Sequence, residues 1–280
     1  MDTGQNIHFR ILEDIAKDLS GEANFPTSLD AAIMVRNTLK SPEVTLDQVA
    51  RAVGLEPLIA SKLLRLSNSV AYNPAGKSIM DLKSAISRLG FESVRTTSLA
   101  VAMDQIMKSK HLANFDFFAK RTWEHSLHTA AISRVLSRRL GRGNPDEAML
   151  AGLVHDIGIF YLLYRAAEYT EYHDNKDAIL ELVLGWHESI GESLLHILGL
   201  PERIIVAVRD HDHLRDIENP CNLSDILYFA NLLAGGKFEW LTDIADPEES
   251  AAVADARERF GALLEEAEED IAELRGALAA

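Results

Sequence analysis

Apolar residues recur at helical spacing along most of the chain, and short stretches rich in Gly, Pro and Asn separate these segments. Residues 1–22 form the first segment. Further helices are predicted over residues 44–53, 57–66, 78–90, 93–107, 117–140, 177–198, 201–212, 222–234 and 248–278, and another begins at Asn144. Since no segment shows sustained alternation of polar and apolar residues between hairpin turns, the pattern predicts an all-α fold.

Several of these helices begin or end with recognisable capping residues. Thr45 and Gln48 have the spacing of a capping box, in which each side chain bonds to the backbone NH of the other residue. Gly54 follows this helix, and Gly readily ends a helix. Asn144, followed by Pro145 and two acidic residues, has the composition of a helix N-terminus.

The segment from Asn114 to Asp116, which contains two turn-forming polar residues, marks a boundary within the chain. Residues 1–112 are therefore predicted to form an N-terminal helical subdomain and residues 113–245 a second helical subdomain. Residues 246–280 contain eleven Asp or Glu and three Arg, a net charge of −8. We expect this segment to form an acidic, amphipathic C-terminal helix.

The composition is that of a soluble globular protein. The 280 residues are 47% hydrophobic, and no uninterrupted apolar run approaches the roughly 20 residues of a membrane span. Cys221 is the single cysteine and cannot form an internal disulfide, and the N-terminus has no basic segment followed by an apolar core. We expect a cytoplasmic protein without membrane contact. The net charge of −15 also argues against binding to nucleic acid.

The helices predicted on either side of Gly54 have the spacing of a helix-turn-helix, so a DNA-binding regulator is one alternative. A recognition helix needs several side chains that reach base edges and phosphates. The second helix offers only Lys62 and Arg65 among mostly apolar residues. Packing of both helices into a bundle is therefore the favoured interpretation.

The adjacent pair His155-Asp156 interrupts an otherwise apolar run from Ala148 to Tyr164. Burial of a charge is unfavourable unless the charge is paired or bound to a metal. An imidazole nitrogen and a carboxylate oxygen are good ligands for a divalent transition metal, but two ligands alone do not hold an ion. The pair itself leaves two interpretations open, a metal site and a hydrogen-bonded pair in the core.

Further histidines precede and follow this pair. His125 and His128 lie three residues apart, on one face of a helix if this segment is helical. His187 lies within a later predicted helix, and Asp210 and His211 end the next one. The sequence thus offers several more nitrogen and oxygen donors that a metal site could use.

A His on one helix, a His-Asp pair on the next and further His positions resemble the HD superfamily of metal-dependent phosphohydrolases. The resemblance is strongest to the HDOD family, the "HD-related output domain" of bacterial signalling proteins. Four segments carry this resemblance: Leu63–Ser69, Ala85–Gly90, Ala151–Gly158 and Gly199–Glu202. Together they represent roughly residues 25–235. The resemblance implies a helical bundle of the HD type preceded by an N-terminal helical subdomain.

In catalytic relatives the minimal metal set is a His, the His-Asp pair and a distant Asp, and the ion activates water to attack a phosphate ester. The resemblance places three of these ligands on His125, His155 and Asp156. The fourth position is Asn231, where the family has Asp, and a neutral amide is a much weaker ligand. Asp210 stands where the two-metal branch has the first of two paired histidines.

Two further departures point the same way. Ile159 stands where catalytic relatives have Lys, and no Gly-Tyr-Pro, the motif of the cyclic-di-GMP phosphodiesterases, follows His211. The resemblance therefore implies a degenerate metal site, whose candidate ligands are His125, His155, Asp156, His187, Asp210, His211 and Asn231. No cofactor is certain, and binding of a divalent ion (Fe, Mn, Zn or Mg) stays open.

The function implied is that of an HDOD signal-transduction module that binds a signalling or regulatory protein partner and does not catalyse a reaction. The alternative is a metal-dependent phosphohydrolase that acts on a nucleotide or a cyclic dinucleotide. Self-association also stays open. The upstream signal is not identified by the sequence.

Overall fold

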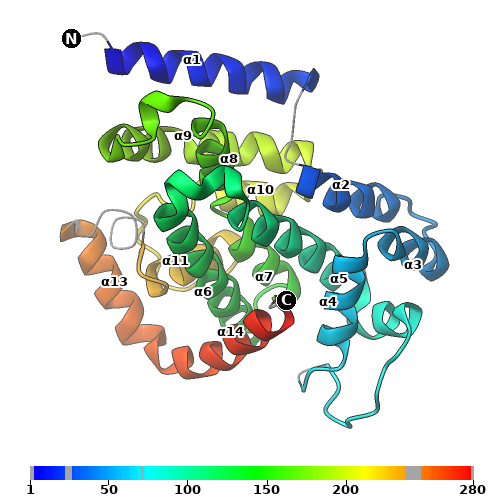
Figure 1. The fold of residues 1–280 in the computed structure, drawn as a ribbon. Helices are drawn as coiled ribbons and strands as arrows, with labels where there is room; N and C mark the ends of the chain where they lie inside the picture. The colour runs from blue at the N-terminus through cyan, green and yellow to red at the C-terminus, as the bar shows by residue number, and fades with distance from the viewer. Residues whose placement is uncertain (1–2, 23–26, 71, 237–246, 279–280) are drawn as a thin grey trace. The chain divides into compact units, whose positions relative to one another are not determined.

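The computed structural model describes residues 3–22, 27–70, 72–236 and 247–278, and within these ranges it contains helices and no strand (Figure 1). The predicted all-α class is confirmed. The α-helices are α1 (Thr3–Lys17), α2 (Thr27–Leu39), α3 (Leu46–Gly54), α4 (Pro57–Ser67), α5 (Leu82–Met107), α6 (Asp116–Leu140), α7 (Pro145–Val154), α8 (Ile157–Ala166), α9 (Lys176–Ile197), α10 (Glu202–Arg209), α11 (Leu223–Leu233), α13 (Pro247–Phe260) and α14 (Leu264–Leu278).

The helix ends follow the local signals in the sequence. Thr45 and Gln48 form the predicted capping box at the start of α3, and the Thr45 NH donates to Gln48 Oε1 at 2.8 Å. Asn144 caps α7 by accepting the NH of Asp146 at 2.9 Å. Gly90 has a φ of 78°, which interrupts the helical geometry of α5. This kink lies where the sequence predicted one helix to end and the next to begin.

The described residues divide into two compact units. Unit one takes its residues from 1–25 and 106–268, and unit two from 26–105 and 269–280. These limits differ from the expected subdomains, because α1 belongs to unit one and α14 begins in unit one and ends in unit two. The expected boundary at 245–246 lies outside the described residues.

The helix α1 belongs to unit one because its apolar face is buried there and acidic side chains in and just after it contact residues of that unit. Ile11 and Ile15 are buried. Asp18, at the start of the π-helix Asp18–Glu22 that follows α1, forms an ion pair with Arg165 Nη1 at 2.8 Å. Asp14, on α1, accepts a hydrogen bond from the Tyr169 hydroxyl. These contacts join residues more than a hundred positions apart, so the local pattern of the sequence did not reveal them.

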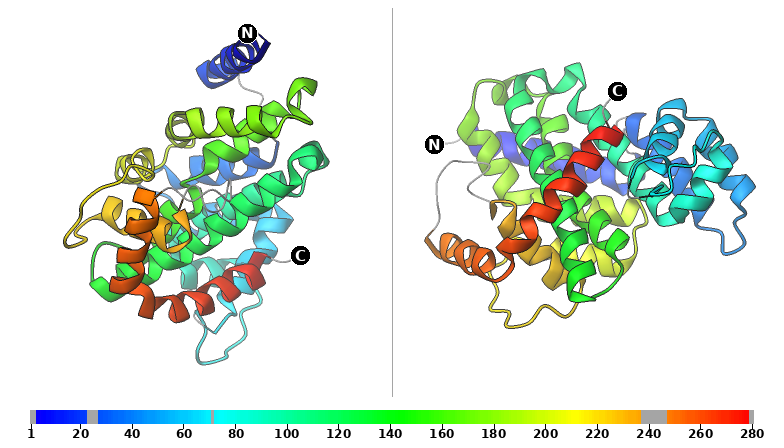
Figure 2. Two further views of the ribbon diagram at one scale, coloured as in Figure 1. Left: turned by 90° about the vertical axis from the view of Figure 1, so that its left-hand side faces the viewer. Right: turned by 90° about the horizontal axis from the view of Figure 1, so that it is seen from below.

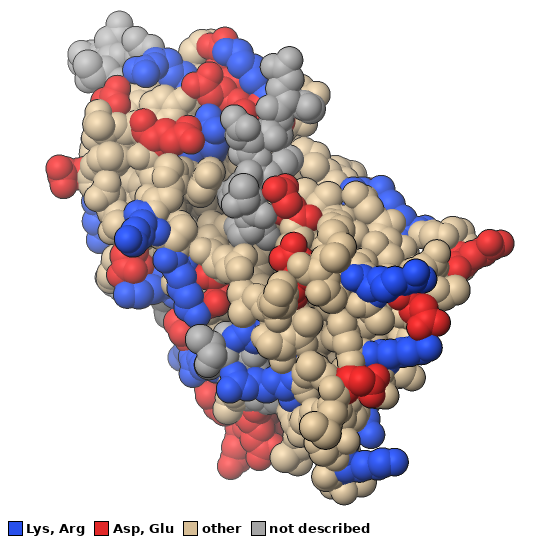
Figure 3. All heavy atoms as spheres, turned by 45° about the vertical axis from the view of Figure 1, so that its right-hand side comes forward, with Lys and Arg blue, Asp and Glu red and all other residues tan. Residues whose placement is uncertain are grey.

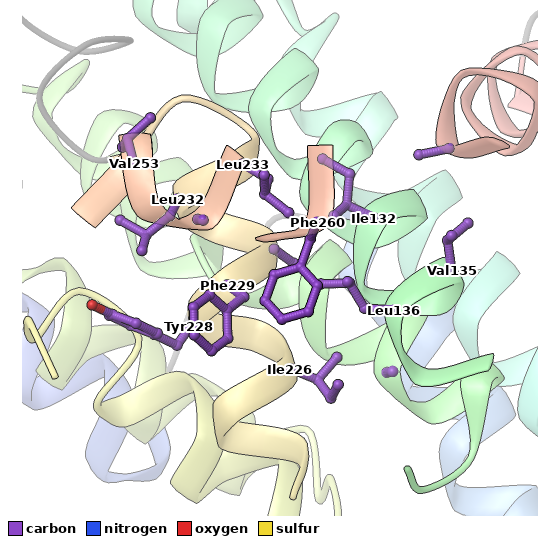
Figure 4. Close-up of a cluster of buried hydrophobic side chains, with 14 residues drawn as sticks. Ile132, Val135, Leu136, Ile226, Tyr228, Phe229, Leu232, Leu233, Val253 and Phe260 are labelled. Carbon is purple, nitrogen blue, oxygen red and sulfur yellow. The ribbon is translucent and has the colours of Figure 1, made fainter. Parts of the chain in front are cut away.

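The acidic C-terminal residues are not one separate helix. A 3-10 turn at Gly261–Leu263 divides the predicted helix into α13 and α14, and Figure 2 shows the chain bending there, from orange to red. The ring of Phe260 lies 5.0 Å from that of Phe229 on α11, measured between centroids. Val253 and Phe260 belong to a buried cluster with side chains of α6 and α11 (Figure 4). The apolar face of α13 is therefore part of the core of unit one.

The stretch Pro145–Ala166 is long and apolar enough, by composition, to cross a membrane. It comprises α7 and α8, and 89% of its most apolar window is buried inside the protein. α7 packs along α6, and α8 packs along α9. This burial is that of a core helix pair, and the stretch contains the His155-Asp156 pair.

Candidate metal centre

His155 and Asp156 lie at the junction of α7 and α8, not within one continuous helix. His155 is the C-cap residue of α7, and Asp156 is the N-cap residue of α8. Glycines on both sides of the junction allow neighbouring helices to approach closely. A Cβ atom on Gly152 would lie 2.6 Å from a carbonyl oxygen of α6, and one on Gly158 would overlap the carbonyl oxygen of His187. α6 and α9 can therefore direct their own histidines toward the junction.

Asn231 on α11 bridges two of the ionisable side chains. Its Oδ1 atom lies 2.8 Å from His125 Nε2 on α6, and its Nδ2 atom donates to Asp212 Oδ1 at 3.0 Å. His125 Nε2 also lies 3.9 Å from Asp156 Oδ2. Both ends of the amide are thus engaged by neighbouring side chains.

Three imidazoles direct their Nε2 atoms toward the carboxylates of the site. The Nδ1 atoms of His155, His187 and His211 donate to backbone carbonyl oxygens three or four residues earlier, at 2.7, 2.9 and 2.6 Å. Their Nε2 atoms face carboxylates: His155 Nε2 lies 3.2 Å from Asp156 Oδ2, and His211 Nε2 lies 3.4 Å from Asp156 Oδ1. A hydrogen-bonded Nδ1 is the usual way in which proteins orient histidines that ligate a metal through Nε2.

Asp212 joins this cluster, although the sequence prediction named Asp210. Asp212 Oδ2 lies 3.1 Å from His187 Nε2, and its Oδ1 lies 3.3 Å from His211 Nε2. The side chain of Asp210 is 41% exposed and pairs with Arg209, so the structure does not bring Asp210 to the site. α10 ends at Arg209. Helical phase therefore gave no signal for which of the two acids points inward.

The structure brings together the six other candidate residues. We call these six and Asp212 the His–Asp cluster: His125, His155, Asp156, His187, His211, Asp212 and Asn231. They come from α6, the α7–α8 junction, α9, the segment after α10, and α11. Contacts between segments far apart in the sequence therefore build this site.

Burial and neighbouring charges shift the pKa values within the cluster. Burial lowers the pKa of His125 to about 4, and the charge of His155 acts in the same direction. Burial also disfavours the charged form of His211, but the carboxylates of Asp212 and Asp156 outweigh it and raise the pKa to about 9. Burial alone would raise the pKa of Asp156, whereas His155 and His211 hold it well below its ordinary value. At neutral pH the metal-free cluster therefore contains a protonated His211 beside an ionised Asp156.

The donor atoms fit a divalent transition metal. His125, His155 and Asp156 form one set whose donor atoms lie within 4.8 Å of one another, and Asp156, His187 and His211 form a second. In the part of the chain that the structure describes, His155 Nε2, Asp156 Oδ2 and His211 Nε2 are buried without a hydrogen bond of good geometry. Nitrogen and carboxylate donors of this kind suit Mn, Fe or Zn. Such an ion, when bound, would lower the pKa of a water molecule and polarise a phosphate oxygen.

The cluster is closed to solvent. Exposure of the side chains is 0–5% for His125, His155, Asp156, His187, His211 and Asp212. A catalytic metal site keeps a coordination position that substrate can reach. With these exposures, the donor atoms offer a phosphate ester in solvent little direct contact.

The helix pair α3–α4 has few of the features of a DNA reader. Lys62 on α4 is 5% exposed, and Arg65 Nη1 donates to the backbone carbonyl of Gly276 at 2.9 Å. Both basic side chains of α4 are thus engaged within unit two. On the face drawn in Figure 3, Lys and Arg side chains are intermixed with Asp and Glu and do not form one stripe. These features do not favour the DNA-binding alternative.

An all-helical bundle that gathers a His, a His-Asp pair and further histidines around one buried centre has the architecture of the HD class. The HDOD domain profile matches residues 25–214, and the chain belongs to the HDOD family. The resemblance expected from the sequence motifs is confirmed. No match was found among curated proteins.

Solved structures of the same fold extend over nearly the whole chain. A candidate metal-dependent phosphohydrolase from Shewanella amazonensis SB2B is 21% identical, with a TM-score of 0.73 over 99% of this chain and 100% of that one. An HDOD domain protein of unknown function from Geobacter sulfurreducens is 19% identical, with a TM-score of 0.57 over 93% and 96%. A candidate signal transduction protein from Marinobacter aquaeolei VT8 is 18% identical, with a TM-score of 0.59 over 98% and 66%. At these identities the similarity establishes the fold.

Proposed function

We propose that this chain is a regulatory module of the HDOD family that acts by binding a signalling or regulatory protein partner in the cytoplasm. In this proposal the His–Asp cluster is a degenerate metal site that supports the fold and does not turn over a substrate. The Marinobacter structure, described as a candidate signal transduction protein, supports a regulatory role.

The closed and internally bonded state of the cluster carries this proposal. Asn231 stands where catalytic relatives have a carboxylate, and its amide is already engaged by His125 and Asp212. The protonated form of His211 places a positive charge between Asp156 and Asp212. This positive charge offsets part of the negative charge of the two carboxylates without an ion, and the donor atoms are shielded from solvent.

The phosphohydrolase remains the second candidate, because one observation favours it. His155 Nε2, Asp156 Oδ2 and His211 Nε2 lack hydrogen bonds of good geometry in the described chain, and each residue belongs to at least one of the two sets that could hold an ion. The similarity to the Shewanella structure, described as a candidate metal-dependent phosphohydrolase, agrees with this alternative.

A hydrolysis screen with metal analysis distinguishes the two. The purified chain is assayed with Mg²⁺, Mn²⁺, Fe²⁺ or Zn²⁺ on cyclic dinucleotides, cyclic mononucleotides and nucleoside monophosphates, and its metal content is measured by mass spectrometry. We expect no turnover above that of the Asp156→Asn variant, which keeps the shape of the side chain and removes its charge. Turnover that this substitution abolishes would establish the phosphohydrolase instead.

Partner binding needs its own experiment, because the absence of hydrolysis would not show that the chain binds a protein. Leu55, at the end of α3, and Leu58, at the start of α4, are 71% and 37% exposed, which makes this turn a suitable apolar contact. Proteins captured by the wild-type chain are identified by mass spectrometry and tested again as purified pairs. We expect Leu55→Asp with Leu58→Asp to weaken the purified complex, and the exposed control Phe9→Asp to leave it unchanged. If no captured protein binds in purified form, the partner-binding proposal fails.

The acidic C-terminal segment is a poor choice for mapping such a contact by truncation. Removal of the residues after Asp246 would take Val253 and Phe260 out of the buried cluster of unit one. The ring of Phe260 packs against that of Phe229, so this truncation would disturb the core as well as any contact surface. Charge reversal at exposed acids is the suitable substitute.

A further inference from the structure

Unit two contains a polar groove with a charge opposite to that of the chain as a whole. The groove has a volume of about 720 Å³. Its lining residues are Leu46, Lys77, Ser78, Ile79, Met80, Asp81, Lys83, Ser84, Ser87 and Arg88. Three cations and one carboxylate give this lining a net charge of +2, whereas the whole chain carries −15. A local reversal of charge of this kind attracts an anion.

The loop that forms one wall of the groove is fixed by side-chain hydrogen bonds. Asn68 Nδ2 donates to the Ile79 carbonyl at 2.8 Å, and the Ile79 NH donates to Asn68 Oδ1 at 2.8 Å. Asn73 Nδ2 donates to the Lys77 carbonyl at 2.8 Å. Gly76 has a φ of 67°, which allows the tight turn between them. The backbone at Lys77 and Ile79 is therefore held in place before any ligand arrives, which lowers the entropy lost on binding.

Two of the cations are available to a ligand. Lys83 pairs with Asp47 at 2.7 Å, and Asp81 accepts the NH of Ser84 at 2.8 Å. Lys77 and Arg88 are exposed and form no ion pair within the described residues. A negatively charged ligand could therefore form ion pairs with both side chains.

The chemistry of the lining indicates the class of ligand. Serine hydroxyls, a Lys and an Arg are the side chains that bind phosphate oxygens, and Arg can do so with two parallel hydrogen bonds. None of the described residues that line the groove is aromatic, so this lining offers no stacking surface for a nucleobase. The volume lies within the range of small-molecule sites and is far larger than one phosphate group. The groove thus favours a phosphate group attached to a polar, non-aromatic body.

We propose that the groove formed by residues 77–88 and Leu46 binds a small, non-aromatic phosphate monoester, such as a phosphorylated sugar or polyol. Lys77 and Arg88 hold the phosphate, and Ser78, Ser84 and Ser87 donate to its oxygens or to the hydroxyls of the body. Met80, 88% exposed at the rim, covers the less polar side of the ligand. This site lies wholly within unit two and does not depend on the His–Asp cluster or on the proposed protein partner.

The test is a titration of the full-length, isotope-labelled chain, followed through its backbone amide NMR signals. The probes are inorganic phosphate, glycerol phosphate, glucose phosphate and adenosine monophosphate, each at ionic strength matched with sodium chloride. We expect saturable shifts at residues 77–88, with glucose phosphate binding more tightly than inorganic phosphate. Binding by Lys77→Ala with Arg88→Ala should be weaker by about a hundredfold, because each charge-assisted hydrogen bond contributes roughly tenfold. The affinity of the Arg88→Lys variant should lie between those of the wild type and the double variant. Lys keeps the positive charge but cannot form the two parallel hydrogen bonds of a guanidinium.

Lys40→Ala is the matched control, because Lys40 is an exposed cation of unit two outside the groove lining. It should leave binding unchanged, as should Asp156→Asn in the His–Asp cluster. Shifts spread over many surface residues, or binding that survives the double substitution, would overturn the proposal. Tightest binding by adenosine monophosphate would overturn the non-aromatic class. A phosphoserine peptide that binds more tightly than every small probe would assign the groove to a protein segment instead.

Discussion

The His–Asp cluster of unit one and the groove of unit two both consist of charged and polar side chains, but they differ in exposure. Cluster side chains are 0–5% exposed and interact with one another, whereas Lys77 and Arg88 in the groove are exposed and lack ion partners within the described residues. Buried charges that are already paired contribute mainly to the structure around them. Exposed and preorganised charges remain available for a ligand. The residues that match a catalytic motif are thus the less accessible of the two groups.

The largest effect expected from this comparison comes from removing the shared carboxylate of the cluster. Asp156→Ala leaves His155 and His211 without the anion they face, and should lower the free energy of unfolding by about 3–5 kcal/mol. Urea denaturation measures this loss. Asp210→Ala is the control, since that carboxylate is half-exposed and lies outside the cluster, and it should change stability little. Equal stability of the two variants would mean that the cluster is not structural.

The next largest loss of stability is expected from the buried apolar cluster of unit one that contains Phe260. Phe260→Ala empties a position in the cluster shared by α6, α11 and α13, and should cost about 3 kcal/mol in urea denaturation. Phe117→Ala, at a site 53% exposed, is the matched control and should cost much less. A Phe260→Ala chain as stable as the wild type would restore the view that the acidic C-terminal segment is separate from the core.

The pH dependence of stability tests the electrostatics of the cluster in metal-free protein. The folded-state pKa of His211 is raised to about 9 from 6.5. The stability that His211 contributes is therefore fully present below pH 6.5 and is lost as the pH rises through 9, on the order of 3 kcal/mol. His125, whose pKa is lowered to about 4, contributes stability that is lost as the pH falls from 6.5 through 4.

Together the two histidines predict a maximum of stability near pH 6.5 in urea titrations over a pH series. His211→Gln should remove most of the decline on the alkaline side, and His213→Gln, outside the cluster, should not. An unchanged alkaline slope in the His211→Gln chain would contradict the pairing of His211 with Asp156 and Asp212.

A smaller effect is expected from restoring the family carboxylate. Asn231→Asp replaces the donor that Asp212 uses with an oxygen, so two buried carboxylates would face each other. Without metal the variant should lose about 1–2 kcal/mol, and Mn²⁺ or Zn²⁺ should stabilise it more than the wild type. Thermal unfolding with and without chelator measures both changes. Asn222→Asp, at the exposed N-cap of the same helix, should show neither, because Asp caps a helix as well as Asn does.

The smallest effect on stability should come from the groove. Lys77→Ala with Arg88→Ala removes two exposed charges, and the free energy of unfolding should change by less than about 0.5 kcal/mol. Urea denaturation of the double variant beside Asp156→Ala makes the comparison direct. A loss as large as that of Asp156→Ala would show that the groove cations support the fold, and the contrast between the two regions would disappear.

The sequence by itself determined the helical class, the capping boxes and the family. Helical periodicity, the Thr45–Gln48 box and the kink at Gly90 depend on neighbours a few residues apart, and such interactions can be predicted from local patterns. Six of the seven residues that the structure gathers in the His–Asp cluster could also be named from the sequence, because the His-Asp pair and the order of the other histidines resemble the family pattern.

Only the tertiary structure decided the rest. The choice of Asp212 over Asp210 depends on the turn after α10, where helical phase no longer applies. The joining of α1 and α13 to the core depends on Tyr169 and Phe229, which lie far away in the sequence. The groove depends on the loop before α5, which Asn68 and Asn73 hold by hydrogen bonds to the backbone carbonyls of Ile79 and Lys77. Each of these features depends on contacts between distant segments or on irregular backbone. The periodicity of side chains along one helix reports only interactions between residues a few positions apart, so it cannot predict either feature.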